Sequence, residues 1–167
     1  MDEIAALRHR IEQLESREAV REAMYRYWRV LDYKLWAELE DCFTPDADCD
    51  WGTAGWQAVG HAQIRAFLHG NESQPGMRLS HFGHNPEVIL DTADPAAATG
   101  IFKLEDWVTL DGVTIMKGFG QYTMRFRRGA DGVWRISRLR LLHDYREEFP
   151  RWIDGRRVAT TPALDKG

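Results

Sequence analysis

Three long strand-like segments follow one another in the C-terminal half of this sequence, and they limit the possible folds more than any other feature. They cover residues 77–91, 96–110 and 113–127. Only short turns, at 94–95 and 111–112, separate them, and turns this short join neighbouring antiparallel strands. A further strand is predicted from residue 133 to about 143. The sequence therefore predicts a meander of four antiparallel strands.

Helical patterns come before these strands. In the first pattern, apolar residues recur at spacings of three, four and three: Ile4, Leu7, Ile11 and Leu14. This spacing predicts an amphipathic helix over residues 3–15, and the helical pattern continues to about Asp32. Two heptads are too few for an independent coiled coil. We therefore expect this apolar stripe to pack on the body of the domain or on a neighbouring subunit.

Shorter elements are predicted between the long helix and the meander. They are a helix over 35–42, a hairpin with strands at 49–51 and 56–59, and a helix over 61–68. Helices first and one curved antiparallel sheet second are typical of an α+β domain, in which the sheet wraps around the helices and leaves a pocket at its open end. We expect one domain over residues 1–149 and a polar surface tail over 150–167.

Composition argues against several classes of protein. Hydrophobic residues make up 44% and charged residues 29% of the chain, as in globular proteins, and no apolar run approaches the ~20 residues of a membrane span. With a net charge of -4 and dispersed basic residues, the chain lacks the basic surface that nucleic-acid binding needs. The charged N-terminus has no secretory signal, so we expect a cytoplasmic protein in which Cys42 and Cys49 are free thiols.

Alternation along the strands predicts which polar side chains face inward. Asp106 shares its parity with three apolar residues of the same segment: Leu104, Val108 and Leu110. Residues of equal parity lie on one face of a strand, so Asp106 is predicted on the inner face. A buried carboxylate needs a partner, because desolvating its charge costs several kcal/mol. Asp106 therefore either has a hydrogen-bonding neighbour or is solvated at the mouth of the sheet.

Two further strands carry polar residues on their predicted inner faces. Gly118 and Gly120 leave space above the sheet, and Tyr122 would place its phenol at the edge of that space. In the last strand the apolar parity changes after Ile136, which predicts a bulge near residues 137–138. This bulge brings His143 onto the inner face.

Two histidines lie three residues apart in the stretch LSHFGHNPEV. His81 and His84 have opposite parity, so in a regular strand they face opposite sides of the sheet and do not share a metal ion. A zinc site needs three or four convergent ligands, and the other histidines are scattered, so we expect no metal site. Gly83 has the parity of His81 and would leave room beside it. Asp32, at the end of the long helix, is of a type that often caps a following helix.

Four motifs occur in an order that resembles a known family. They read RYWRVLDYKLWAELEDCFTPDA, MRLSHFGHNPEVILD, TGIFKLED and DGVWRI. Over about residues 5 to 145 the chain resembles the SnoaL-like branch of the nuclear transport factor 2-like superfamily, and within it scytalone dehydratase and bile-acid 7α-dehydratase. The resemblance implies a cone: a strongly bent antiparallel sheet around helices, a cystatin-like α+β barrel with its ligand inside. It also implies a homodimer or homotrimer formed through the sheet.

The resemblance also implies which residues form the site. The catalytic positions of the family correspond to Tyr27, Asp32, His81 and Asp106, and the inward tyrosine of the next strand corresponds to Tyr122. Two positions differ from the relatives: His143 stands where the bile-acid enzyme has an arginine, and Trp51 where a pocket tyrosine is usual. These differences imply a different ligand, or a different way of holding a similar one.

A lyase that removes water from a hydroxylated, mostly apolar ring compound, such as a steroid or polyketide, is the main functional hypothesis. His81 would act as general base and acid, Asp32 or Asp106 would hold its other ring nitrogen, and Tyr27 would donate to the substrate oxygen. The side chains expected to shape the pocket are Trp51, Trp56, Tyr122 and His143. This chemistry requires neither a cofactor nor a metal ion.

Two other functions remain open from the sequence. A ketosteroid-type isomerase would use the same base to move a proton without losing water. A non-catalytic binding protein of the same fold would not need an activated histidine, and this hypothesis predicts that His81 and Asp32 lie too far apart to hydrogen-bond. The seven Trp, seven Phe and five Tyr residues suit either a core of large side chains or a pocket for a planar or alicyclic ligand.

Overall fold

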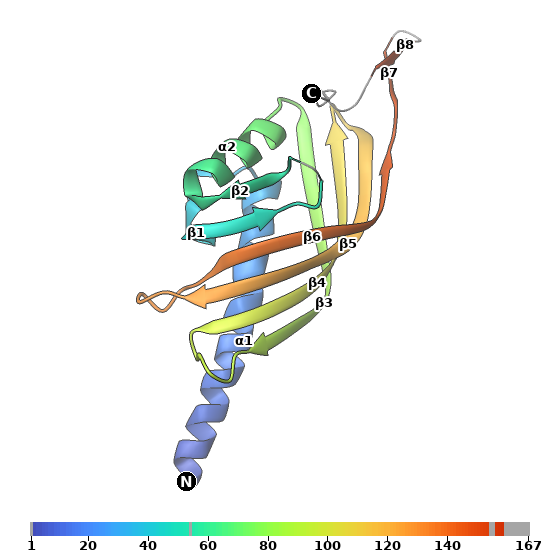
Figure 1. The fold of residues 1–167 in the computed structure, drawn as a ribbon. Helices are drawn as coiled ribbons and strands as arrows, with labels where there is room; N and C mark the ends of the chain where they lie inside the picture. The colour runs from blue at the N-terminus through green and yellow to red at the C-terminus, as the bar shows by residue number, and fades with distance from the viewer. Residues whose placement is uncertain (1, 54, 154–155, 159–167) are drawn as a thin grey trace.

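The computed structural model describes residues 2–53, 55–153 and 156–158, with side chains up to residue 150. Its helical elements are α1 (Glu3–Asp32), the 3-10 helices η1 (Trp36–Glu38) and η2 (Glu40–Cys42), and α2 (Gly60–Glu72). Its strands are β1 (Phe43–Asp50), β2 (Gln57–Val59), β3 (Met77–Leu90), β4 (Ala97–Leu110), β5 (Val113–Arg128), β6 (Trp134–Glu148), β7 (Arg151–Ile153) and β8 (Arg156–Val158). Figure 1 shows the helices on one side of a strongly bent sheet.

Six strands form the main sheet, in the order β2-β1-β6-β5-β4-β3. The predicted meander is confirmed: β3, β4, β5 and β6 pair antiparallel in sequence order. The pair β1 and β6 is parallel, so the sheet is mixed rather than wholly antiparallel. Parallel neighbours need a long crossover, and here the chain from β2 to β5 provides it. The α+β architecture is confirmed, with a curved sheet whose outer strands β2 and β3 do not pair to close a barrel.

Interruptions in the strand register accompany the bend of the sheet. Arg125 pairs with Arg138 and Phe126 pairs with Ile136, so Ser137 is left over on β6, where the sequence predicts a bulge. A second shift between Phe119 and Gly120 lies further along the same pair of strands. An extra residue in one strand bends it and increases the local twist. The long strands therefore curve around the C-terminal half of α1 (Figure 1).

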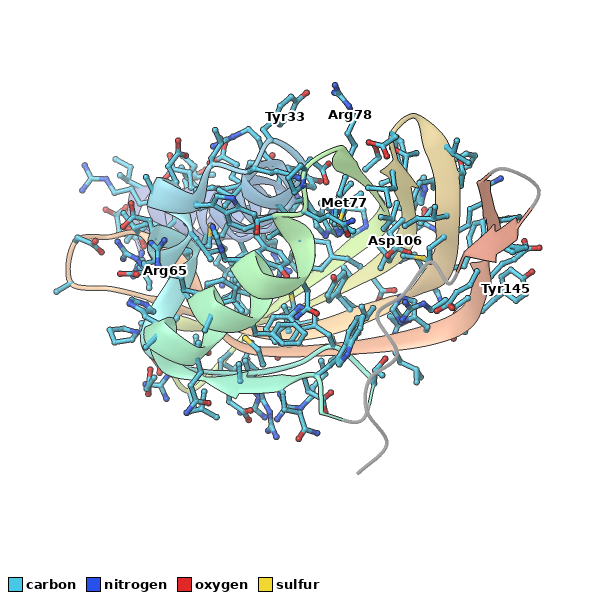
Figure 2. The ribbon with its side chains drawn as sticks, turned by 90° about the horizontal axis from the view of Figure 1, so that it is seen from above. Tyr33, Arg65, Met77, Arg78, Asp106 and Tyr145 are labelled. Atoms are coloured by element: carbon cyan, nitrogen blue, oxygen red, sulfur yellow. The ribbon has the colours of Figure 1, made fainter. Side chains whose placement is uncertain are left out.

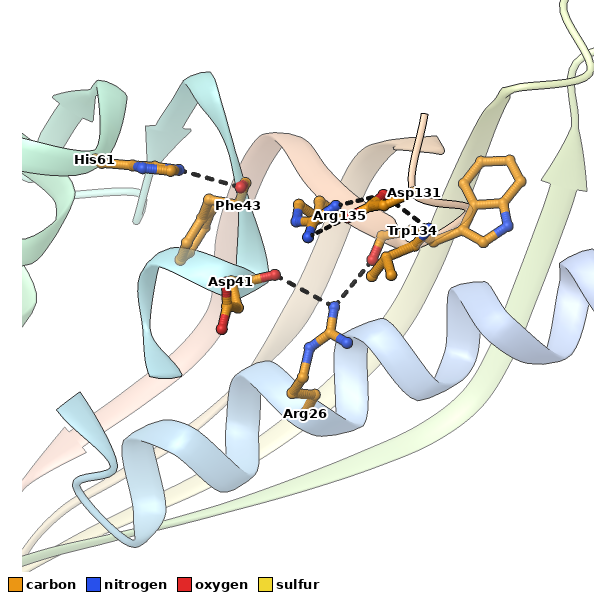
Figure 3. A network of polar contacts seen from close by, with 8 residues as sticks. Arg26, Asp41, Phe43, His61, Asp131, Trp134 and Arg135 are labelled. Carbon is orange, nitrogen blue, oxygen red and sulfur yellow. Dashed lines mark hydrogen bonds and ion pairs between the residues drawn. The ribbon is translucent and has the colours of Figure 1, made fainter. Parts of the chain in front are cut away.

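Aromatic contacts and a group of hydrogen bonds fix α1 against the sheet. The Trp28 ring meets Phe102 of β4 edge-on, with centroids 6.0 Å apart. Arg26 donates to the carbonyl oxygens of Trp134, at 2.9 Å, and Asp41, at 3.4 Å. Figure 3 shows these bonds near the turn between β5 and β6. They join α1 to β6 and η2, so the helix has a defined position along the sheet.

Several element boundaries differ from the predictions. Two 3-10 helices replace the predicted helix over 35–42, and β1 begins at Phe43 instead of Cys49. Helix α2 continues to Glu72, one turn beyond its predicted end, and β6 continues to Glu148, beyond 143. Pairing with β5 maintains this last part of β6, although its sequence is polar. The predicted tail, 150–167, contains the β7–β8 hairpin and lies partly outside the described residues.

The apolar stripe at the start of α1 does not pack on the body of the domain. Its four side chains are between 53% and 60% exposed: Ile4, Leu7, Ile11 and Leu14. This alternative is therefore wrong, because the N-terminal half of α1 extends beyond the sheet (Figure 1). Cys42 and Cys49 are buried and free, as predicted. Within the described part of the chain, no helix combines the length and apolarity that a membrane span requires.

Substitution of Gly83 is expected to destabilise the fold. A Cβ atom at Gly83 would overlap the Trp28 indole, which is wedged against Phe102. Gly83→Ala should therefore lower the free energy of unfolding by roughly 1–3 kcal/mol, as other overpacked sites do. The measurement is urea denaturation followed by tryptophan fluorescence. Gly70→Ala, within α2, is the matched control, because a Cβ atom added there meets no atom within 4 Å. This substitution should leave the free energy of unfolding unchanged or raise it. Equal stabilities for the two variants would contradict the packing argument.

Candidate active site

Asp32 and His81 form a close polar contact at the inner face of the sheet. Asp32 is the last residue of α1, and His81 lies in β3. Asp32 Oδ1 is 2.6 Å from His81 Nδ1, and Asp32 Oδ2 accepts a hydrogen bond from the His81 backbone N–H at 3.1 Å. Two bonds to one residue fix both the position and the orientation of the ring. Nε2 is thus the ring nitrogen that can exchange a proton with a ligand.

The surroundings of His81 favour its charged form. Burial alone would lower the pKa of His81, whose side chain is 6% exposed. The hydrogen bond and the charge of Asp32, together with the carboxylates of Glu72 and Asp106, outweigh burial and raise this pKa above its usual 6.5. The distance between His81 and Asp32 also contradicts the prediction of the non-catalytic hypothesis, which required the two residues to be far apart.

A cavity of about 210 Å³ opens beside His81. It lies between α1, α2 and the inner face of the sheet, and its aromatic and aliphatic wall includes Tyr27, Leu31, Trp51, Trp56, Phe67, Leu79, Val108, Ile115, Tyr122 and Leu141. Trp51 stacks on Phe67 with ring centroids 4.4 Å apart, and Trp56 meets Phe67 edge-on at 5.7 Å. Both tryptophans predicted to shape the pocket therefore line it. Apolar walls with few polar groups are typical of small-molecule sites.

Two buried tyrosines lie in the wall of this cavity. Trp51 Nε1 donates a hydrogen bond to the Tyr27 hydroxyl oxygen at 3.0 Å, and the Tyr27 hydroxyl is also within hydrogen-bonding reach of the Tyr122 phenol. Burial raises the pKa of Tyr27 and that of Tyr122 well above the usual value for a phenol. Both phenols are therefore neutral hydrogen-bond donors at physiological pH.

Asp106 and His143 form a second acid–histidine pair across the cavity. Asp106 is 8% exposed and pairs with His81 across the β3–β4 ladder, so the two share the inner face, as parity predicted for Asp106. Its Oδ2 atom is 3.9 Å from His143 Nε2. Gly118 makes this contact possible, because a Cβ there would overlap the Asp106 carboxylate. Figure 2 shows Asp106 inside the molecule, between α2 and the strands.

Unsatisfied polar atoms mark this second pair as open to a ligand. Within the described part of the chain, Asp106 Oδ1 and His143 Nε2 are buried without a hydrogen-bond partner. Leaving such atoms unpaired costs free energy, which a polar ligand in the cavity would recover. Of the two carboxylates considered for orienting His81, the one within hydrogen-bonding distance of its ring is that of Asp32.

Glu72 is a site residue that the sequence analysis missed. It lines the cavity from the last turn of α2, and its Oε2 atom is buried without a hydrogen-bond partner in the described structure. Burial raises the pKa of Glu72 to about 7, although the charge of His81 opposes this shift. The predicted helix ended at residue 68, which left Glu72 in a presumed loop. A predicted helix extended by one more turn, to residue 72, would have placed Glu72 on the helix beside the cavity.

Arg146 and Glu148 were missed for a related reason. They line the cavity from the part of β6 beyond residue 143, where the predicted strand ended. The Arg146 guanidinium lies 5.2 Å from the centre of the Trp56 ring, a distance at which a cation and an aromatic face attract each other. These two residues therefore add charged groups to a cavity wall that is otherwise mainly apolar.

His84 lies on the outer side of the sheet, opposite to His81, and the parities of the two residues predicted that they face opposite sides. The His84 side chain is 54% exposed, and its Nε2 atom is 3.7 Å from Glu105. The space that Gly83 was expected to leave beside His81 is filled by the Trp28 ring. Asp32 and His81 also border a shallow outer hollow with His84. The pair thus lies between the cavity and the exterior, where it can exchange protons with solvent.

Potential metal ligands do not gather in the described structure. In residues 2–53, 55–153 and 156–158, no three His, Cys, Asp or Glu side chains are arranged to hold a metal ion. The polar groups of the site are instead distributed as pairs around the cavity.

Stability is expected to depend on pH through Glu72. Its folded pKa of about 7 exceeds its usual 4.5, so its contribution to stability is present below pH 4.5 and is lost as pH rises through 7. Glu72→Gln removes this loss. The variant should gain about 1 to 3 kcal/mol relative to the wild type between pH 4.5 and pH 8, measured by urea denaturation across that range. Glu87→Gln, at an exposed position, is the control. A similar pH dependence of stability in both variants would contradict the raised pKa of Glu72.

Comparisons with known proteins identify the family and the fold of this chain. The family model described as a SnoaL-like domain matches residues 12–140. A Novosphingobium aromaticivorans protein provisionally named scytalone dehydratase is 19% identical, with a TM-score of 0.73 over 83% of this chain and 90% of its own. A type 2 hexachlorocyclohexane dehydrochlorinase is also 19% identical, with a TM-score of 0.70 over 83% and 92%.

A third solved structure shows the same fold with lower coverage. ActVI-ORFA from Streptomyces coelicolor is 17% identical, with a TM-score of 0.67 over 76% of this chain and 96% of its own. At these identities the structures establish a shared fold, and the family model establishes membership over most of the described domain. The chain belongs to the SnoaL-like domain family.

Proposed function

We propose that this protein is a lyase that removes water from a hydroxylated, mostly apolar ring compound without a cofactor. The observation that carries the proposal is the Asp32–His81 contact of 2.6 Å beside an apolar cavity. Elimination of water next to a carbonyl needs a base for a carbon-bound proton and an acid for the leaving hydroxide. A histidine held by a carboxylate can do both in turn.

The reaction begins when His81 Nε2 takes the proton from the carbon next to the carbonyl. The electron pair of the broken C–H bond moves into the carbonyl group and forms an enolate, whose oxygen accepts a hydrogen bond from Tyr27. The enolate then collapses to a carbon–carbon double bond and expels hydroxide, which takes the proton from the His81 imidazolium. The products are an unsaturated carbonyl compound and water, and His81 is neutral again.

Asp32 supports this cycle by stabilising the imidazolium that forms in the first step. Its hydrogen bond to Nδ1 also keeps Nε2 directed to the substrate, as the aspartate does in hydrolytic triads. The same hydrogen bond raises the pKa of His81, so a higher pH is needed before the neutral, basic form predominates. Tyr27 is suited to its role because its phenol is buried and retains its proton. One such hydrogen-bond donor in a site without water often stabilises the transition state by ~3 kcal/mol.

Glu72, Asp106 and His143 are positioned to complete the polar part of the site. Glu72 has a pKa of about 7, so near neutral pH it is protonated in part of the molecules and can donate a hydrogen bond to the leaving hydroxyl group, while His81 supplies the proton. The unsatisfied atoms of Asp106 and His143 are suited to binding a substrate hydroxyl. We assign these three residues to substrate binding and to hydrogen bonding of the leaving hydroxyl group.

The size and lining of the cavity support a compact ring compound. An apolar cavity of roughly 150 Å³ holds benzene, so about 210 Å³ accommodates one or two rings. Larger substrates, including steroids, would extend through the open end toward Arg146 and Glu148. The names of two similar structures, a dehydratase and a dehydrochlorinase, denote loss of water and of hydrogen chloride. Both reactions are eliminations, and this supports the reaction class that we propose.

Turnover is expected to depend on His81. A thermal-shift screen of hydroxylated mono- and bicyclic ketones selects compounds that bind the folded protein, and mass spectrometry then follows their conversion. The wild type should produce a compound lighter by one water, and His81→Ala should lower the rate by at least about a thousandfold without changing the circular dichroism spectrum. His84→Ala, on the outer face, is the matched control and should retain the rate. An unchanged rate for His81→Ala would contradict the mechanism.

The same assay separates the other functions. Conversion without a change in mass would indicate an isomerase. Tight binding of several ring compounds without any conversion, in both the wild type and His81→Ala, would indicate a binding protein.

The pH dependence of the reaction is expected to shift when Asp32 is replaced. In the wild type, kcat/KM should rise with pH through a value above 6.5, because the base must be neutral and its pKa is raised. Asp32→Asn removes the charge that raises this pKa, so the rise should move to lower pH while the maximal rate falls by roughly 10²–10⁴-fold. Pre-steady-state or steady-state rates between pH 5 and 9 provide the measurement. An Asp32→Asn profile that coincides with the wild type would show that His81 is not the titrating base.

A further inference from the structure

The N-terminal half of α1 presents an apolar stripe that the fold leaves exposed. Ile4, Leu7, Ile11 and Leu14 are 59%, 55%, 53% and 60% exposed. Single exposed leucines are common on protein surfaces. These four apolar residues, at spacings of three, four and three, occupy the a and d positions of two heptads. Such positions form the seam of a coiled coil.

This stripe faces away from the body of the domain. A helix turns by about 100° per residue, so the nine positions from Ile11 to Val20 amount to about 180° beyond two full turns. Val20, Met24 and Tyr27 lie on the face that α1 buries against the sheet. The stripe therefore lies on the opposite side of the helix, and a partner can approach it without meeting the domain. In Figure 1 this part of α1 projects beyond the sheet.

We propose that residues 3–17 pair with the same residues of a second copy of this chain as a parallel, two-stranded coiled coil. Isoleucine at a positions with leucine at d positions favours two parallel strands. Ile4 and Ile11 occupy a, and Leu7 and Leu14 occupy d. The next a and d positions are Glu18 and Arg21, which contact each other at 2.9 Å. The apolar seam thus ends where the helix enters the domain.

Charges beside the seam select the parallel direction. In a parallel pair each g position meets the e position five residues later on the partner helix. Glu3 then meets Arg8 of the second copy, and Arg10 meets Glu15 of the second copy, so both contacts join opposite charges. An antiparallel pair centred on the same stripe would bring Arg8 against Arg8 and Arg10 against Arg10, and would join opposite charges only between Glu3 and Arg17.

The helix is already formed before it pairs, which makes so short a seam sufficient. Isolated helices of this length are marginal because nucleation is costly. Here the C-terminal half of α1 is packed in the core, and its N-terminal half continues the same helix. A preformed surface loses less conformational entropy on association. We therefore expect a dimer that depends on protein concentration.

Disulfide trapping tests the parallel register. Ile11→Cys places a thiol at an a position, where it faces the same residue of the second copy in a parallel pair, whereas Ala5→Cys lies on the far side of the helix. The native thiols Cys42 and Cys49 are buried in the domain. Under mild oxidation, Ile11→Cys should form a covalent dimer at least about tenfold faster than Ala5→Cys, seen on non-reducing gels and by mass spectrometry. Equal rates, or no dimer from either variant, would overturn the proposal.

Sedimentation equilibrium of charge variants provides an independent test. Arg10→Glu should weaken the dimer roughly three- to tenfold, because it places like charges together, and Arg10→Glu/Glu15→Arg should restore the affinity. Leu7→Glu/Ile11→Glu should abolish this association while circular dichroism shows an intact fold. If Leu7→Glu/Ile11→Glu associates as strongly as the wild type, the association belongs to another surface, such as the sheet, and the assignment is overturned. A failure of the double charge reversal to restore affinity overturns it as well.

Discussion

Asp32 connects the end of the long helix to the sheet, and both the position of the cavity and the chemistry of His81 depend on this connection. Its two oxygens accept hydrogen bonds from the backbone and the ring of His81, so one carboxylate sets the distance between α1 and β3, the ring orientation and the direction of the pKa shift. The cost of placing a carboxylate at this half-buried position is offset because both bonds are made, and the same carboxylate favours the charged form of the histidine.

The cavity is apolar in most of its wall and yet is lined by Glu72, Asp106, His81 and His143. Burial and the nearby carboxylates of Asp32 and Asp106 raise the pKa of Glu72 to about 7. The hydrogen bond to Asp32, together with the same carboxylates, raises the pKa of His81 despite its burial. The site therefore has groups that gain and lose protons near neutral pH, which is the requirement of general acid–base chemistry.

Much of the sheet and part of the site followed from the sequence. Side chains alternate across a strand, so parity placed Asp106, Tyr122 and His143 on the inner face, and the structure has all three lining the cavity. The extent of α2 and β6 was less predictable, because tertiary contacts extend helices and strands beyond their local patterns. Glu72 and Arg146 lie in these extensions, and for that reason local patterning missed them.

The sequence by itself determined the α+β architecture, the four-stranded meander, the bulge near Ser137 and the opposite faces of His81 and His84, because each of these depends on the spacing of neighbouring residues. Only the tertiary structure decided that Asp32, and not Asp106, is bonded to His81, that β1 lies parallel to β6, and that the first apolar stripe faces away from the domain. Asp32 and His81 are 49 residues apart in the chain. A contact over that separation depends on how whole elements pack, and local sequence patterns carry no information about that packing.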